Sequence, residues 1–292
     1  MHNFLFFYAN FIGVMNWIVE IFQDLHISKI PNSFNSCIYS KQMDYLIDIA
    51  KEAVEAIEKA IRKVAKENFG KEVAMGADGT PTLYIDKVAE DAALEVIGKE
   101  ANVLSEEAGY IDNGKEYTFA IDPIDGTRNA AHGIPFYGIS IAIGRKSVED
   151  VEYGIVKNIP SGDVYEAIKG EGAYLNGRRI EVSKDYSDII YILTLGESGN
   201  EKTWKLVKFN TIRAMGAAAI EMCLVACGAA HAYFMPKESL RITDFAAGCL
   251  IVREAGGEVY NANGEVLNVP FNLKVRSSVL AVASRKIAEA LL

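Results

Sequence analysis

The chain has 292 residues, half of them hydrophobic and 24% of them charged, and its formal net charge is −9. These values are typical of a globular protein with enough chain for a large core. The acidic balance, with no run rich in lysine or arginine, argues against the basic face that a nucleic-acid-binding protein presents. We therefore expect no nucleic-acid partner.

The first 42 residues differ in composition from the rest. Phe4 to Val19 is rich in aromatic and aliphatic residues, yet it lacks the basic start and cleavage site of a signal peptide and is short for a membrane span. Residues 31–36 are typical of a linker. We predict a main domain over residues 43–292 with no membrane contact. Residues 1–42 would be a peripheral extension, or would reflect an upstream start assigned in error.

Two helices open the predicted domain. Apolar residues at three- and four-residue steps predict the first over about Asp44–Phe69, with Gly70 as its stop. Residues 76–82 form either a mobile loop beside a site or a plain connector. The second helix is predicted over about Leu83–Gly98. Asp86 in its first turn is either an acid favoured by the helix dipole or an outer metal ligand.

The central stretch is the motif Asp-Pro-Ile-Asp-Gly-Thr at residues 122–127, which follows an apolar strand at 117–121. Pro123 favours an extended conformation at Asp122, and Gly126 permits a tight turn into a helix. The carboxylates of Asp122 and Asp125 can then converge on one point. Three amides at the helix start would attract an anion, those of Gly126, Thr127 and Arg128.

A second apolar strand, at Val103-Leu104, also ends in acids, Glu106 and Glu107. Each motif alone is also typical of an ordinary turn or loop. Together, two strands that end in carboxylates favour a shared site for a hard cation, and the nearby amides favour a phosphate. The combination predicts metal-assisted phosphoryl chemistry.

The next part of the chain is rich in strands. We predict them at 137–144, 151–157, 164–169 and 189–195, with a hairpin turn at Asn176-Gly177. Residues 211–228 predict a strand, a glycine turn and a helix. The small residues at 216–219 either leave the backbone open to a ligand or serve core packing.

A strand at 231–235 precedes a helix that opens near Arg241 and stops at Gly256-Gly257. Thr243 or Asp244 is its natural N-cap, so Asp244 is either a cap or a fourth carboxylate of the site. Strands at 258–260 and 279–283 complete a second sheet. Two helices, then a mixed sheet, then alternating helices and strands predict a layered α+β sandwich.

The cysteines do not predict a metal site, because no two of them are separated by only two residues. Cys223 and Cys227 share one face of the predicted helix and are expected to be buried thiols. The cysteine pattern also gives no disulfide framework, so we expect a cytoplasmic protein.

In order along the chain, Ser-Glu106-Glu107, the motif at 122–127, and Asp244 before Glu254-Ala-Gly-Gly257 resemble the inositol monophosphatase superfamily. The sequence is most similar to the archaeal branch with inositol-1-phosphatase and fructose-1,6-bisphosphatase activity. This resemblance implies an alternating αβαβα layered sandwich, the sugar-phosphatase fold, divided into halves at about 43–185 and 186–292. It also implies a homodimer and a phosphatase of carbohydrate metabolism that uses two or three Mg²⁺ ions.

The same resemblance implies roles for individual residues. The metal ligands would be Glu106, Asp122, the carbonyl of Ile124, Asp125 and Asp244, with Asp86 near a third metal. Thr127 and Glu106 would position the attacking water, and Asp122 would complete the catalytic set. The substrate, a small phosphorylated sugar or polyol, would contact Asp125, Gly126, Thr127, Arg128, Arg213, Gly216 and Ala218.

Two departures from the family pattern bear on the substrate. Animal inositol monophosphatases have a Glu seven residues before the last metal Asp, where this chain has Lys237, and Arg241 lies between. Cations there would suit a second phosphate, although Lys237 also fits plain surface charge. The lysine common in the family's first loop is not evident near Met75. The alternatives are a phosphatase for NADP or 3′-phosphoadenosine-5′-phosphate, and a non-catalytic partner of transcription machinery.

Overall fold

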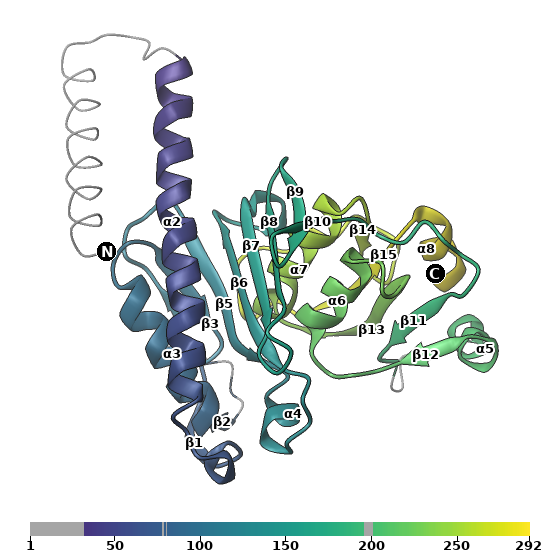
Figure 1. Ribbon diagram of the computed structural model, residues 1–292, viewed down its shortest axis with the longest axis horizontal. Helices are drawn as coiled ribbons and strands as arrows, with labels where there is room; N and C mark the ends of the chain where they lie inside the picture. Colours follow the sequence, from purple (N-terminus) through teal and green to yellow (C-terminus); the bar gives the residue numbers. More distant parts are fainter. Residues whose placement is uncertain (1–31, 78, 80, 196–200) are drawn as a thin grey trace. The chain divides into compact units, whose positions relative to one another are not determined.

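The computed structural model describes residues 32–77, 79, 81–195 and 201–292 (Figure 1). The predictions for residues 1–31 lie outside this range. The chain divides into two units, Met1–Ile49 and Ala50–Leu292. Every predicted site residue belongs to the second unit. None of the helices in the described residues is long and apolar enough to cross a membrane.

The first described helix, α2 (Asn32–Ile61), corrects two predictions. Residues 32–36 are helical rather than a linker, and the helix ends at Ile61 rather than Phe69. No proline or glycine lies between Asn32 and Ile61, so nothing interrupts the helix at its predicted start. After the helix, the backbone N–H groups of Lys63 and Val64 donate to carbonyl oxygens three residues earlier instead of four. A 3₁₀ turn, η1 (Lys66–Asn68), follows.

An eight-stranded sheet forms one of the two large β layers, in the order β10-β9-β8-β7-β6-β5-β3-β4. All eight residues of β5 are buried. The turn at Asn176-Gly177 joins β9 to β10 with positive φ angles at both residues, as predicted. The strands are β3 (Asn102–Ser105), β4 (Gly109–Ile111), β5 (Thr118–Asp125), β6 (Gly138–Gly144), β7 (Tyr153–Asn158), β8 (Val164–Ile168), β9 (Gly172–Leu175) and β10 (Arg178–Ile180).

The second layer is a five-stranded sheet in the order β12-β11-β13-β15-β14. Its strands are β11 (Ile190–Leu193), β12 (Thr211–Arg213), β13 (Ala232–Leu240), β14 (Glu258–Tyr260) and β15 (Ser277–Val282). Two helices that the sequence pattern did not reveal are α5 (Glu201–Phe209) and α8 (Arg285–Leu291), which contact each other. Ile287 and Leu291 of α8 join the apolar cluster on this sheet.

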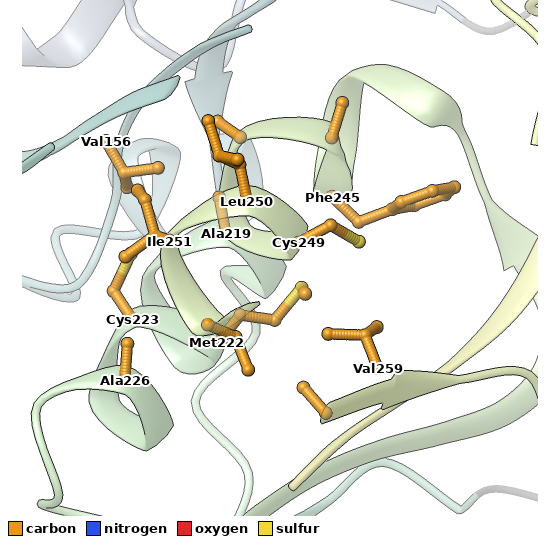
Figure 2. Packing of buried hydrophobic residues seen from close by; sticks show 14 of the residues in the cluster. Val156, Ala219, Met222, Cys223, Ala226, Phe245, Cys249, Leu250, Ile251 and Val259 are labelled. Atoms are coloured by element: carbon orange, nitrogen blue, oxygen red, sulfur yellow. The ribbon is translucent and has the colours of Figure 1, made fainter. Parts of the chain in front are cut away.

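Helices α6 (Ala218–Ala226) and α7 (Ile242–Glu254) lie between the two sheets and contact both. Every residue of α7 from Ile242 to Val252 is buried. Figure 2 shows side chains of both helices, including Met222, Cys223 and Phe245, packed into the shared core. The packing is close, since a Cβ added to Gly154 of β7 would lie 3.1 Å from the Cα of Ala247.

The outer face of the eight-stranded sheet carries further helices. Helix α3 (Tyr84–Ile97) contacts β5, and Lys51 of α2 forms an ion pair of 2.9 Å with Glu166 of β8. The predicted αβαβα sandwich is therefore confirmed. Residues 76–82 were predicted as a loop, but 81 and 82 belong to the second strand of an antiparallel pair, β1 (Glu72–Met75) and β2 (Pro81–Leu83), so the predicted loop extends two residues too far.

Candidate active site

A cavity of about 560 Å³ lies where the ends of β3 and β5 meet the first turns of α3, α6 and α7. Strands β3 and β5 are parallel neighbours, with Ser105 opposite Ile121. Glu106 and Asp122, which directly follow those positions, therefore lie at the same edge of the sheet. The acidic residues that line the cavity are Glu72, Asp86, Glu106, Glu107, Asp122, Asp125, Glu221 and Asp244.

An irregularity in β5 brings Asp122 and Asp125 together. In the pairing with β6, Asp122 lies opposite Ser140 and Asp125 opposite Gly138, so β5 contains one extra residue. Side chains three apart on a regular strand point to opposite faces, and the extra residue cancels that alternation. Pro123 suits this position because it has no N–H to pair. The bulge explains how both carboxylates reach one cavity.

Gly126 makes the turn that follows. Its φ of +86° lies in the left-handed region, and an added Cβ would lie 3.0 Å from the Cβ of Ala217 and 3.2 Å from the carbonyl oxygen of Gly216. The helix that it opens, α4 (Thr127–Ala131), has five residues. The predicted sequence of strand, tight turn and helix is confirmed.

Asp125 joins the β5 motif to helix α6. Its Oδ2 accepts a hydrogen bond of 3.2 Å from the backbone N–H of Ile220, in the first turn of α6. Asn129 adds a second link, because its Nδ2 donates to the carbonyl oxygens of Phe136 (2.7 Å) and Met215 (2.6 Å). The turn before α6 is therefore held against the central motif.

Glu221 is a site residue that the sequence analysis missed. It is buried, and its Oε1 accepts hydrogen bonds from the backbone N–H groups of Met215 (2.6 Å) and Gly216 (3.2 Å). Burial raises its pKa, against the lowering effect of these hydrogen bonds. A single acid in the otherwise apolar segment 217–227 was the available signal.

Asp86 and Asp244 occupy equivalent positions in α3 and α7. Each is the third residue of its helix, and its Oδ2 accepts a hydrogen bond from the backbone N–H of the residue just before the helix. Leu83 donates to Asp86 (3.3 Å), and Arg241 donates to Asp244 (2.8 Å). The predicted N-cap, Thr243 or Asp244, is wrong, because the extended residue before α7 is Arg241. Asp244 nevertheless both supports the helix start and lines the cavity.

Burial and crowding make these carboxyl groups hard to ionise. Burial, together with the neighbouring Asp244 carboxylate, raises the pKa of Asp125 well above its usual range. Burial and then Asp125 do the same to the pKa of Asp122. Burial raises the pKa of Asp86 to about 7, against the lowering effect of the Thr127 hydroxyl. A site that concentrates buried carboxylates in this way favours a bound cation.

Two glutamates shape the end of β3. Glu90, which the sequence analysis did not identify, is buried and accepts hydrogen bonds from the hydroxyl of Ser105 and the backbone N–H of Ala108 (2.9 Å). Glu107 accepts a hydrogen bond from the hydroxyl of Thr82 in β2. These contacts fix the segment that carries Glu106.

Most of the residues predicted to contact the substrate line the cavity: Asp125, Gly126, Thr127, Arg128, Gly216, Ala218 and Arg241. Lys237 and Arg213 do not belong to the lining. Lys237 is exposed on β13, and Arg213 is exposed, with its Nη1 donating to the carbonyl oxygen of Ile212 (2.9 Å). His132 is exposed, and its Nδ1 lies 2.8 Å from the carbonyl oxygen of Arg128.

The donor atoms of the cavity fit a hard divalent cation. Within the part of the chain that the structure describes, no three His, Cys, Asp or Glu side chains are arranged as an assembled metal centre. The predicted ligands that line the cavity nevertheless offer oxygen atoms only, from five carboxylates and the carbonyl of Ile124. Mg²⁺ prefers such ligands.

Known proteins match most of this chain. Residues 42–292 match the model of the inositol monophosphatase family. A fructose-1,6-bisphosphatase/inositol-1-monophosphatase of Methanothermobacter thermautotrophicus is 38% identical over 266 residues, which cover 84% of this chain and 94% of that protein. A bifunctional NADP phosphatase/NAD kinase of Methanococcus maripaludis is 36% identical over 263 residues, 80% of this chain and 46% of that protein. A solved structure from Pyrococcus horikoshii, described as a hypothetical protein with similarities to inositol-1 monophosphatase, has a TM-score of 0.74 at 30% identity and covers 84% of this chain and 96% of its own.

Proposed function

The chain belongs to the inositol monophosphatase family and is a phosphoric monoester hydrolase, and we propose that it hydrolyses inositol-1-phosphate, fructose-1,6-bisphosphate or both with Mg²⁺. The observation that carries this proposal is the oxygen-lined cavity at the ends of β3 and β5. It combines carboxylates for a cation with backbone amides for a phosphate.

The metal ligands would be Asp86, Glu106, Asp122, the carbonyl of Ile124, Asp125 and Asp244, and they would hold two or three ions. When bound, Mg²⁺ supplies an activated water and neutralises charge on the phosphate and the leaving oxygen. The bulge in β5 and the hydrogen bond from Ile220 orient Asp122 and Asp125 for this role. No covalent enzyme intermediate is required.

The remaining residues of the site would position water and substrate. Thr127, with Glu106, orients the attacking water, and the amides of Gly126 and Thr127 donate hydrogen bonds to phosphate oxygens. Since α4 has only five residues, these donors act as individual N–H groups more than through a helix dipole. Gly216 and Ala218 leave room for the sugar or polyol.

A nucleotide phosphatase is the second candidate, favoured by the similarity to the NADP phosphatase/NAD kinase, of which this chain covers 46%. Fold alone does not choose between these substrates.

We further propose that the protein is a cytoplasmic homodimer. Light scattering of the purified protein tests the dimer, and a monomeric mass would contradict it.

The test of function is phosphate release from the purified full chain. The substrates are inositol-1-phosphate, fructose-1,6-bisphosphate, NADP and 3′-phosphoadenosine-5′-phosphate, each with Mg²⁺ and with excess EDTA. We expect EDTA-sensitive turnover of one or both of the first two. Turnover of a nucleotide alone would replace the proposed substrate class and keep the metal chemistry. Absence of metal-dependent turnover on all four would favour the non-catalytic role in transcription.

A further inference from the structure

Arg241 lies among the acidic residues that line the cavity. Its Nη2 lies 2.5 Å from Oε1 of Glu106, and its Nη1 lies 3.7 Å from Oδ1 of Asp244. The side chains of Arg241, Glu106 and Asp244 are 20%, 18% and 10% exposed, so these contacts are partly shielded from water. One guanidinium thus spans carboxylates from the end of β3 and the start of α7.

The backbone of Arg241 fixes the origin of this side chain. Its N–H donates to Oδ2 of Asp244 at 2.8 Å, which holds the residue at the N-terminus of α7. In this arrangement the arginine supplies positive charge to the carboxylates that the proposed metals would use.

The Arg241 guanidinium and a divalent cation both carry positive charge, so a cation bound to Glu106 would be repelled by its neighbour. We propose that Arg241 is a built-in counter-cation of this carboxylate cluster, and that it competes with Mg²⁺ for Glu106. This inference rests on the proposed metal-dependent function. The Arg241–Glu106 pair stabilises the protein without metal and, by competition, weakens metal affinity.

The test compares Mg²⁺ binding to the full chain and to its Arg241→Met variant by titration calorimetry without substrate. Methionine keeps an unbranched apolar stem and removes the charge and the forked donors. We expect the Mg²⁺ dissociation constant to fall by roughly three- to tenfold, because a partly shielded ion pair no longer has to be broken. In EDTA, the melting temperature of the variant should fall by about 2–4 °C.

Two matched variants separate direct competition from general electrostatics. Arg128→Met removes a positive charge from another residue that lines the cavity, and Arg213→Met removes one from outside the lining. We expect a smaller tightening for Arg128→Met and no change for Arg213→Met. An Arg241→Lys variant keeps the charge and loses the forked N–H donors of the guanidinium, so it should bind Mg²⁺ with intermediate affinity. If Arg241→Met does not fold, the Arg241→Lys variant is used for the test instead.

Unchanged or weaker Mg²⁺ binding by the Arg241 variants would overturn the inference, and so would equal tightening in Arg128→Met. In both cases metal-dependent turnover by the wild-type protein would leave the proposed function standing. A wild-type protein that neither binds Mg²⁺ nor hydrolyses any substrate would overturn both proposals.

Discussion

The hydroxyl of Thr127 lies 2.9 Å from Oδ1 of Asp86. The same hydroxyl lies 2.9 Å from the carbonyl oxygen of Ile124. A hydroxyl has one proton, so it donates to one of these acceptors at a time. The contact links α4, which follows the central motif, to the first turn of α3. It fixes Thr127 at the edge of the cavity, where the proposed mechanism needs it.

Replacement of Thr127 by Val tests this role. Valine keeps the shape of the side chain and removes the hydroxyl, so we expect kcat to fall by about 100-fold through loss of water positioning. Thr127→Ser, which keeps the hydroxyl, should stay within several-fold of the wild type. The measurement is steady-state phosphate release at saturating Mg²⁺, with melting temperatures to show that both variants fold. A Val variant with wild-type kcat would remove Thr127 from the mechanism.

The raised pKa of Asp86, about 7, makes the metal-free protein sensitive to pH. A carboxyl whose pKa is raised on folding favours the folded state below its unfolded pKa of about 4, and this contribution is lost as pH rises through 7. Asp122 and Asp125 shift in the same direction. In EDTA, stability should therefore fall between about pH 4 and pH 7.

Mg²⁺ should reverse that loss, because metal and protons compete for the same oxygens. We expect the rise in melting temperature on adding Mg²⁺ to be larger at pH 8 than at pH 5. Differential scanning fluorimetry at the two pH values, with and without EDTA, measures it. A rise that does not depend on pH would contradict the assignment of these carboxyl groups as metal ligands.

The position of Lys237 outside the cavity lining bears on the second phosphate of fructose-1,6-bisphosphate. Arg128 is an exposed cation that does line the cavity. Arg128→Met should raise KM for the bisphosphate by about tenfold, since a charge-assisted contact is lost, and should affect inositol-1-phosphate less. Lys237→Glu should change both KM values less than Arg128→Met does. The opposite order would restore Lys237 as the phosphate contact.

Glu221 supports the turn at Gly216 from within the core. Glu221→Ala leaves the N–H groups of Met215 and Gly216 without this acceptor. We expect a loss of about 2–3 kcal/mol in the free energy of unfolding, measured with urea. Glu221→Gln keeps an acceptor oxygen and should cost less. Equal losses for the two variants would argue against this hydrogen-bonding role.

Local sequence patterns predicted much of the site. The strand before Asp122, the tight turn at Gly126 and the acids after β3 all depend on residues close in the chain. Two strands that end in carboxylates predicted a shared site, whereas the parallel pairing of β3 with β5 that creates it joins strands that are not consecutive in the chain. The single-residue bulge that aligns Asp122 with Asp125 is set by pairing with β6 and is not evident from sequence.

The missed features depend on contacts between distant segments. Arg241, expected at the rim for a second phosphate, lines the cavity and also pairs with Glu106, 135 residues earlier in the chain, a contact that local sequence does not reveal. Glu90 was missed because nothing in the sequence pattern of α3 distinguishes it from the other charged residues of that helix. The start of α2 was misplaced because asparagines and serines at 32–36 are typical of linkers, whereas the structure continues the helix through them.

We propose that the buried carboxylates of the β5 motif hold the catalytic metal, and the Asp122→Asn variant is the sharpest test of this role. The amide is a poor Mg²⁺ ligand, so phosphate release at saturating Mg²⁺ should fall by at least about 100-fold. Because the variant removes a buried charge, its melting temperature in EDTA should equal or exceed that of the wild type. A folded Asp122→Asn protein that retains wild-type turnover would show that Asp122 does not hold the catalytic metal.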